Sequence, residues 1–147
     1  MRRFGLIGRP LGHSASAAYF TEKFRSEGIT DCEYSLYELP SIEALPALLE
    51  RLPELCGLNV TIPYKREVMD FLDAVSSEAQ AIGAVNCIRR AADGSLTGYN
   101  TDIIGLARAT GMSMEELAQF LTQLKRGGAP FITPNTKEDT NYVHEEE

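Results

Sequence analysis

Short apolar runs alternate along the first hundred residues with segments in which apolar side chains recur every three or four positions. The short runs have the length of β-strands, and they cover residues 4–7, 32–38, 58–62, 83–88 and 96–99. The last two runs flank an Asp-Gly pair at residues 93–94, which is typical of a hairpin turn. The pattern therefore predicts five strands, of which the last two form an antiparallel hairpin.

Helical spacing of apolar residues fills the segments between these strands. The predicted helices run from Ser14 or Ser16 to Gly28, from Ser41 to Leu52, and over residues 66–72, 76–82 and 103–109. Strands that alternate with helices favour a mostly parallel sheet with helices on both of its faces. We therefore predict an α/β fold, a three-layer α/β/α sandwich whose mostly parallel sheet contains one antiparallel hairpin.

The character of the chain changes after Gly111. Ser113, with Glu116 three residues later, is typical of a helix start. Residues 133–147 hold one Lys against five Asp and Glu, a net charge of −4, and such a polar, acidic composition is typical of disorder. The sequence therefore divides into a domain at residues 1–110, a helix at 111–126 and a disordered acidic tail at 127–147.

Composition excludes some functions without indicating one. The 147 residues are 44% hydrophobic and 24% charged, which suits one globular domain. The formal net charge of −7 argues against nucleic acid or an anionic membrane as a partner. With two histidines and three widely spaced cysteines, a His-based metal site is disfavoured and reduced thiols are expected. Because neither a signal peptide nor an apolar run of about 20 residues is visible, we expect a cytoplasmic protein.

Polar side chains surround the end of the third predicted strand. Asn59 and Thr61 alternate with apolar residues, Pro63 stops the strand, and Lys65 follows. Open α/β sheets bind their ligands at the carboxyl ends of their strands, so an amide, a hydroxyl and an ammonium group here favour a binding site. In the alternative interpretation, Asn59 and Thr61 bond only to the loop backbone and Lys65 is solvated.

Further candidates come from other strand ends and loops. Asp102 follows the last predicted strand at a helix start, where the helix dipole favours a carboxylate, and Asn86 lies in the fourth predicted strand. If Lys65 and Asp102 meet, they form a proton-transfer pair in which the carboxylate orients the ammonium group. The hydroxyls of Ser14 and Ser16 suit a small polyhydroxylated acid. Helix capping is the simpler role for Asp102 and for both serines.

Four motifs then follow one another in a recognisable order: Gly8–Ser16, Asn59–Lys65, Gly83–Asn86 and Gly98–Asp102. Together they closely resemble the substrate-domain motifs of the shikimate dehydrogenase family, and the resemblance extends over residues 4–108. It implies reversible reduction of 3-dehydroshikimate to shikimate with NADPH. One departure is Ala17, because the family often has proline at this position.

The resemblance also implies roles for seven residues: Ser14, Ser16, Asn59, Thr61, Lys65, Asn86 and Asp102. Ser14 and Ser16 match the serines that hold the substrate carboxylate. The residues that match Asn59, Thr61, Asn86 and Asp102 bind the substrate hydroxyls. Those that match Lys65 and Asp102 form the catalytic pair.

The family continues into a dinucleotide-binding domain with a glycine-rich phosphate loop after a strand. In this chain Gly127 and Gly128 are the only candidates, and they neither follow a predicted strand nor show G-x-G-x-x-G spacing. The resemblance therefore implies NADP as the cofactor of the family, whereas we expect no cofactor to bind this chain.

The sequence is thus interpreted as the substrate-binding domain of a shikimate dehydrogenase. Shikimate or 3-dehydroshikimate is the expected small-molecule partner, with no nucleic acid and no membrane. Two alternatives stay open: a non-catalytic binding module for a shikimate-like acid, and a remnant that folds only as a structural domain.

Overall fold

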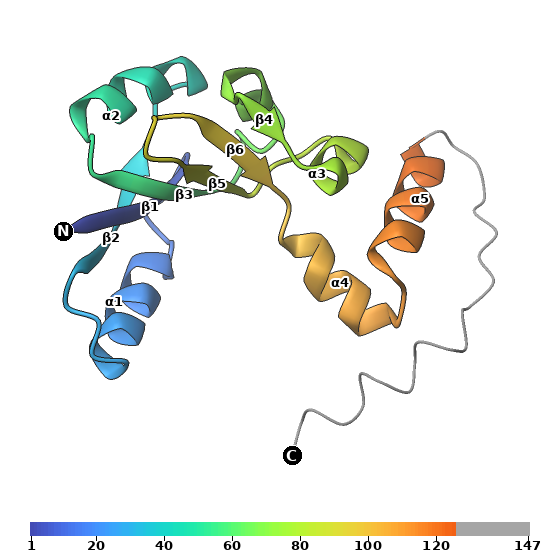
Figure 1. Cartoon of the computed structure of the whole chain (residues 1–147), viewed down its shortest axis with the longest axis horizontal. Coiled ribbons are helices and arrows are strands. Elements are labelled where there is room, and N and C mark those ends of the chain that lie inside the picture. Colours follow the sequence, from blue (N-terminus) through green and yellow to red (C-terminus); the bar gives the residue numbers. More distant parts are fainter. Residues whose placement is uncertain (126–147) are drawn as a thin grey trace.

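A six-stranded sheet forms the centre of the computed structural model, which describes residues 1–125 (Figure 1). Its strands are β1 (Arg2–Gly8), β2 (Cys32–Glu38), β3 (Leu55–Val60), β4 (Ala74–Val75), β5 (Cys87–Arg90) and β6 (Leu96–Tyr99). They lie in the order β2-β1-β3-β5-β6-β4. β1 is parallel to β2 and β3, and β4 is parallel to β6. β5 runs antiparallel to both of its neighbours, β3 and β6.

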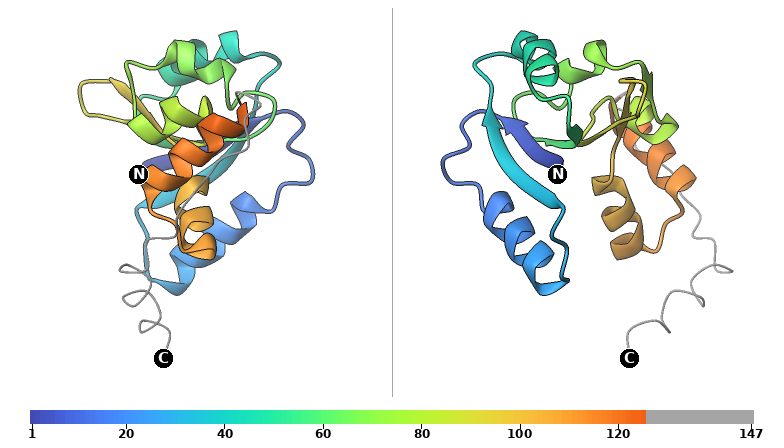
Figure 2. Two further views of the ribbon diagram at one scale, coloured as in Figure 1. Left: turned by 90° about the vertical axis from the view of Figure 1, so that its right-hand side faces the viewer. Right: turned by 60° about the vertical axis from the view of Figure 1, so that its left-hand side comes forward.

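Helices lie on both faces of this sheet (Figures 1 and 2). The α-helices are α1 (Ser16–Ser26), α2 (Leu45–Arg51), α3 (Ser77–Ile82), α4 (Asp102–Thr110) and α5 (Met114–Lys125), and the 3-10 helices are η1 (Ile42–Ala44) and η2 (Glu67–Phe71). α1 packs on β1 and β2 from one face, whereas α2 and η2 lie on the other. The predicted α/β/α layers and the β5–β6 hairpin are confirmed.

The larger hydrophobic core lies between the sheet and α2. Ile7 of β1, Leu45 of α2 and Leu55 of β3 are at most 1% exposed. Pro46 does not break α2, because it stands in the first helical turn, where a backbone N–H has no helical acceptor. Burial of one such Leu or Ile side chain is worth about 1.5–3 kcal/mol, so this core supplies much of the stability.

A smaller core lies on the opposite face, under α1. Leu6 and Tyr34 are buried there, and Phe20 and Phe24 of α1 pack against them while staying partly exposed. α1 has no fully buried residue, so this face of the sheet is less deeply covered than the face under α2.

α4 and α5 form a helical hairpin that packs beside α3. The Ser113 hydroxyl accepts the Glu116 N–H at 3.1 Å, and the Glu116 carboxylate accepts the Ser113 N–H at 2.9 Å. These two bonds form a capping box, which confirms the predicted helix start. The predicted disordered tail at residues 127–147 lies outside the described part of the chain. Within residues 1–125, the structure has no helix with both the length and the apolarity needed to cross a membrane.

Three strands differ from the predictions. The run at residues 58–62 is shifted, because β3 begins at Leu55 and ends at Val60, so Thr61 and Ile62 follow the strand. The run at residues 83–88 becomes a strand only from Cys87, because Gly83 ends α3 in the left-handed conformation at φ 74°. Asn86 therefore lies in the turn before β5, not in a strand as predicted. β4 was not predicted, since two residues are too few to show an alternating pattern.

Gly8 stands where β1 meets the loop that follows β3. A Cβ atom built at Gly8 would collide with the Thr61 methyl group and lie 3.0 Å from the Ile62 carbonyl oxygen. Thr61 N–H donates to the Ile7 carbonyl at 2.9 Å, and Arg9 N–H donates to the Ile62 carbonyl at 3.1 Å. The absence of a side chain at Gly8 therefore lets two strand ends approach closely.

We expect Gly8→Ala to lower the free energy of unfolding by about 1–3 kcal/mol, because the added methyl group overpacks this junction. Urea denaturation followed by circular dichroism measures the change. Gly12→Ala is the matched control, since a Cβ atom there meets no other atom within 4 Å. Equal losses of stability in the two variants would contradict the close approach at Gly8.

Candidate active site

Lys65 and Asp102, 37 positions apart in the sequence, meet at the edge of the sheet where β3 and β6 end. Lys65 Nζ lies 3.1 Å from Asp102 Oδ2, and the two side chains are 36% and 64% exposed. The Lys65 carbonyl accepts the Val85 N–H at 2.7 Å, which ties this loop to the turn before β5. The charged pair anticipated from the sequence is therefore formed, and it stays open to solvent and to a ligand.

Asp102 is the first residue of α4, and its carboxylate reaches Lys65 instead of capping the helix. Thr101 is the N-cap residue, and its side chain makes no capping hydrogen bond. The Asp102 N–H is instead accepted by the Asn100 side chain at 3.1 Å. The simple capping role considered for Asp102 is thus not what the structure shows.

Two buried amides hold the backbone around this pair. Asn86 and Asn100 are each 8% exposed. Asn86 Oδ1 accepts the Thr101 N–H at 2.8 Å, and Asn86 Nδ2 donates to the Thr101 hydroxyl at 2.9 Å. Asn100 Nδ2 donates to the Ala84 carbonyl at 3.0 Å. Breaking these bonds would leave a buried amide without partners, which costs about 1–3 kcal/mol. The bonds therefore hold the start of α4 against the turn before β5.

Asn59 and Ser16 belong to a second group, on the α1 side of the sheet. The Tyr34 hydroxyl donates to Asn59 Oδ1 at 2.9 Å. Ser14 Oγ accepts the Ser16 N–H at 3.3 Å, and Ala15, not a serine, is the N-cap of α1. The expectation that Ser14 or Ser16 is the N-cap residue of this helix is therefore wrong. The Ser14 hydroxyl instead accepts the N–H of Ser16, the first helical residue.

The backbone joins the two groups. Val60 N–H donates to the Asn86 carbonyl at 2.8 Å, so the end of β3, which carries Asn59 and is followed by Thr61, is fixed beside Asn86. Within residues 1–125, no side-chain hydrogen bond links Ser14 or Ser16 to Lys65, Asn86 or Asp102. Six of the seven predicted site residues thus fall into two groups: Lys65, Asn86 and Asp102 at the ends of β3 and β6, and Ser14, Ser16 and Asn59 on the α1 side. The seventh, Thr61, follows β3 with its methyl group against Gly8.

Three supporting residues escaped the sequence analysis. Tyr34 bonds to Asn59, Asn100 bonds to the start of α4, and the Glu38 carboxylate accepts the Leu11 N–H at 2.8 Å in the loop that leads to Ser14. Tyr34 and Glu38 are ordinary residue types for a strand, so no local pattern distinguishes them, whereas Asn100 lies inside the Gly98–Asp102 motif and could have been found there.

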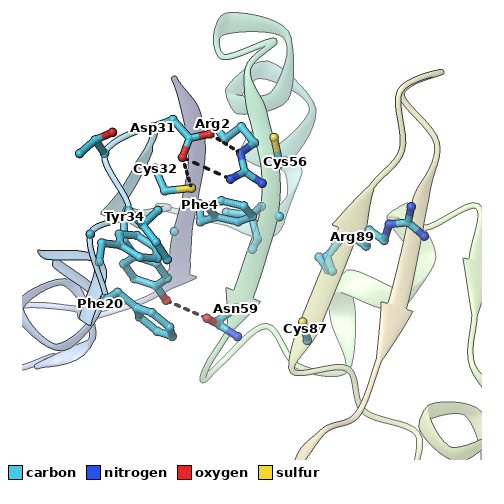
Figure 3. A pocket seen from close by; sticks show the side chains of 18 residues that line it. Arg2, Phe4, Phe20, Asp31, Cys32, Tyr34, Cys56, Asn59, Cys87 and Arg89 are labelled. Carbon is cyan, nitrogen blue, oxygen red and sulfur yellow. Dashed lines mark hydrogen bonds and ion pairs between the residues drawn. The ribbon is translucent and has the colours of Figure 1, made fainter. Parts of the chain in front are cut away.

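A cavity of about 720 Å³ opens on the α1 face, next to Asn59 (Figure 3). Four aromatic side chains, Phe4, Phe20, Phe24 and Tyr34, line part of its wall, and Cys87 lines the side formed by β5. Burial raises the pKa of the Cys87 thiol, which therefore stays protonated and weakly nucleophilic at neutral pH.

The described residues do not fit a dinucleotide. The loops that lead from β1 to α1 and from β6 to α4 lack G-x-G-x-x-G spacing, and α4 begins with the carboxylate of Asp102, which would repel a pyrophosphate. No group of three or more His, Cys, Asp or Glu side chains in residues 1–125 is arranged to hold a metal ion.

Comparison with known sequences agrees with these motifs. The family model for the shikimate dehydrogenase substrate binding domain matches residues 6–88. Shikimate dehydrogenase (NADP(+)) of Clostridium perfringens is 44% identical over 114 residues, which cover 74% of this chain and 40% of that protein. The protein of the same name from Pyrococcus abyssi is 38% identical over 130 residues, which cover 88% of this chain and 48% of that protein. This chain therefore matches less than half the length of either relative.

Solved structures show the same fold. Shikimate dehydrogenase 1 of Peptoclostridium difficile superposes with a TM-score of 0.69 at 31% identity, covering 88% of this chain and 54% of the other. Shikimate 5-dehydrogenase of Thermus thermophilus, solved in complex with shikimate, gives a TM-score of 0.67 at 32% identity, covering 87% of this chain and 54% of the other. With the family model spanning residues 6–88, this chain belongs to the shikimate dehydrogenase family and carries its substrate-binding domain.

Proposed function

We propose that this chain binds 3-dehydroshikimate or shikimate as the substrate-binding part of an NADP-dependent shikimate dehydrogenase. The observation that carries the proposal is the Lys65–Asp102 pair, at 3.1 Å and accessible to a ligand, beside strand ends that bear amides and hydroxyls. The relatives named shikimate dehydrogenase and the structure in complex with shikimate support the choice of substrate.

Lys65 is the proposed acid–base residue. Reduction of a ketone adds a hydride to carbon and a proton to oxygen. In this proposal the Lys65 ammonium group delivers the proton to the oxygen, and in the reverse direction the neutral amine accepts the proton of the hydroxyl group. Asp102 orients Lys65 Nζ and stabilises its positive charge. A positioned group of this kind is typically worth about 10²–10⁴ in rate.

The remaining candidates bind the substrate. Ser14 and Ser16 stand beside the amino end of α1, where two hydroxyls suit a carboxylate. Asn86 uses one of its two amide N–H groups on Thr101, which leaves the second for a substrate hydroxyl. Asn59 and Thr61, at the end of β3, are proposed to bind further hydroxyls. NADPH is proposed to bind outside this chain, because the described residues do not fit it.

Lys65→Ala is expected to leave the fold intact, because an exposed ion pair is worth only about 0.2–1 kcal/mol. Shikimate binding should weaken modestly, and turnover in a fusion of this chain with an NADP-binding domain should fall by about 10² or more. Binding is measured by calorimetry and turnover from NADPH absorbance. Arg66→Ala, which removes the neighbouring exposed cation, is the control. A turnover rate close to that of the parent would remove Lys65 from the catalytic role.

The double change Ser14→Ala with Ser16→Ala should weaken shikimate binding by about 10-fold or more, because two hydrogen bonds to a carboxylate are lost. Stability should fall by no more than about 1 kcal/mol, the cost of a typical helix cap. Calorimetry and thermal melting measure the two effects. Ser26→Ala at the far end of α1 serves as the control. Normal binding with a clearly lowered melting temperature would favour a purely structural role for both serines.

A fluorescence titration of the 147-residue chain with NADPH is expected to show no saturable binding. The physical reason is that a pyrophosphate needs a glycine-rich turn at a helix N-terminus, whereas α4 offers a carboxylate and residues 133–147 are acidic. Shikimate added in the same buffer is the positive control. Saturation at micromolar NADPH would contradict the absence of a cofactor site.

A further inference from the structure

We propose that Tyr34 is a positioning residue of the substrate site, whose hydroxyl holds the Asn59 amide with its N–H donors turned toward the substrate. This inference rests on the proposed function, in which Asn59 binds a substrate hydroxyl. Tyr34 matches no residue of the substrate-binding motifs, and its role follows from its contacts.

The direction of one hydrogen bond carries the argument. The Tyr34 hydroxyl donates to Asn59 Oδ1 at 2.9 Å, so the carbonyl end of the amide faces Tyr34 and the nitrogen end points away (Figure 3). No other hydrogen bond of the Asn59 side chain is formed within residues 1–125. A half-turn of the Asn59 amide exchanges its oxygen and its nitrogen. Tyr34 selects the orientation in which the oxygen faces the tyrosine hydroxyl.

The Tyr34 ring is held firmly enough to act in this way. Tyr34 is 8% exposed, and its ring stacks on Phe20 of α1 with centroids 4.4 Å apart and planes at 19°. Phe4, its register partner on β1, packs in the same hydrophobic cluster and borders the ring from the neighbouring strand. Because stacking restricts the ring, little conformational entropy is lost when its hydroxyl holds a neighbouring side chain.

The hydroxyl also remains a donor under all physiological conditions. Burial raises the pKa of Tyr34 to about 12, although an interaction with the Ser16 side chain acts in the opposite direction. The Tyr34–Asn59 hydrogen bond therefore connects β2 to the end of β3.

The test uses Tyr34→Phe in the 147-residue chain, because the ring and its stacking are kept while the hydroxyl is removed. Asn59→Ala and the double variant complete a cycle, and Tyr37→Phe is the matched control. Tyr37 lies on the same strand but packs over Gly5 on the opposite face, and its hydroxyl bonds to nothing in residues 1–125. Calorimetry gives the shikimate dissociation constants, and NMR follows the Asn59 side-chain amide, assigned by its loss in Asn59→Ala.

We expect Tyr34→Phe to weaken shikimate binding about 3- to 10-fold, the usual effect of one neutral hydrogen bond, and to have no further effect in the Asn59→Ala background. The Asn59 amide signals should shift and exchange faster with solvent, whereas Tyr37→Phe changes neither quantity. Equal weakening in both backgrounds, or unchanged Asn59 signals, would overturn the proposal. If the parent chain binds no shikimate, the proposed function fails, and the Asn59 signals alone decide whether Tyr34 holds this amide.

Discussion

The close contact between the carboxyl ends of β1 and β3 is the constraint on which the rest of the site depends. Gly8 has no side chain, so the Thr61 methyl group and the Ile62 carbonyl can lie against it, and two backbone hydrogen bonds lock the strand ends together. The loop from β1 carries the serines and the loop from β3 carries Lys65. Their contact therefore brings a carboxylate-binding and a proton-transferring region of the proposed site to one edge of the sheet.

The site separates the buried groups that fix the backbone from the exposed pair that is proposed to transfer a proton. Asn86 and Asn100 are buried, and their hydrogen bonds fix the turn before β5 and the start of α4. Lys65 and Asp102 remain exposed, where an ion pair contributes little to folding. A proton-transferring pair can therefore change its charge without threatening the fold. Tyr34 has the same kind of supporting role, because its buried ring places a hydroxyl that hydrogen-bonds to Asn59 at the edge of the pocket.

Local patterns predicted most elements because they act over a few residues. β2 matches the predicted run at residues 32–38, and the Ser113–Glu116 capping box starts α5 as expected. The strand at 83–88 was placed too early, since Gly83 ends a helix in the left-handed conformation instead of opening a strand. The two-residue β4 forms by pairing with β6, and such pairing depends on tertiary contact more than on composition.

The sequence by itself determined the alternation of strands and helices, the hairpin and the four motifs that place the chain in its family. The family resemblance implied that Lys65 pairs with Asp102, but only the tertiary structure shows their contact across 37 positions and brings Tyr34 to Asn59 across 25. The physical reason is the range of the interactions. Periodicity and capping depend on neighbouring residues, whereas a hydrogen bond between distant side chains depends on the order and register of the strands that carry them.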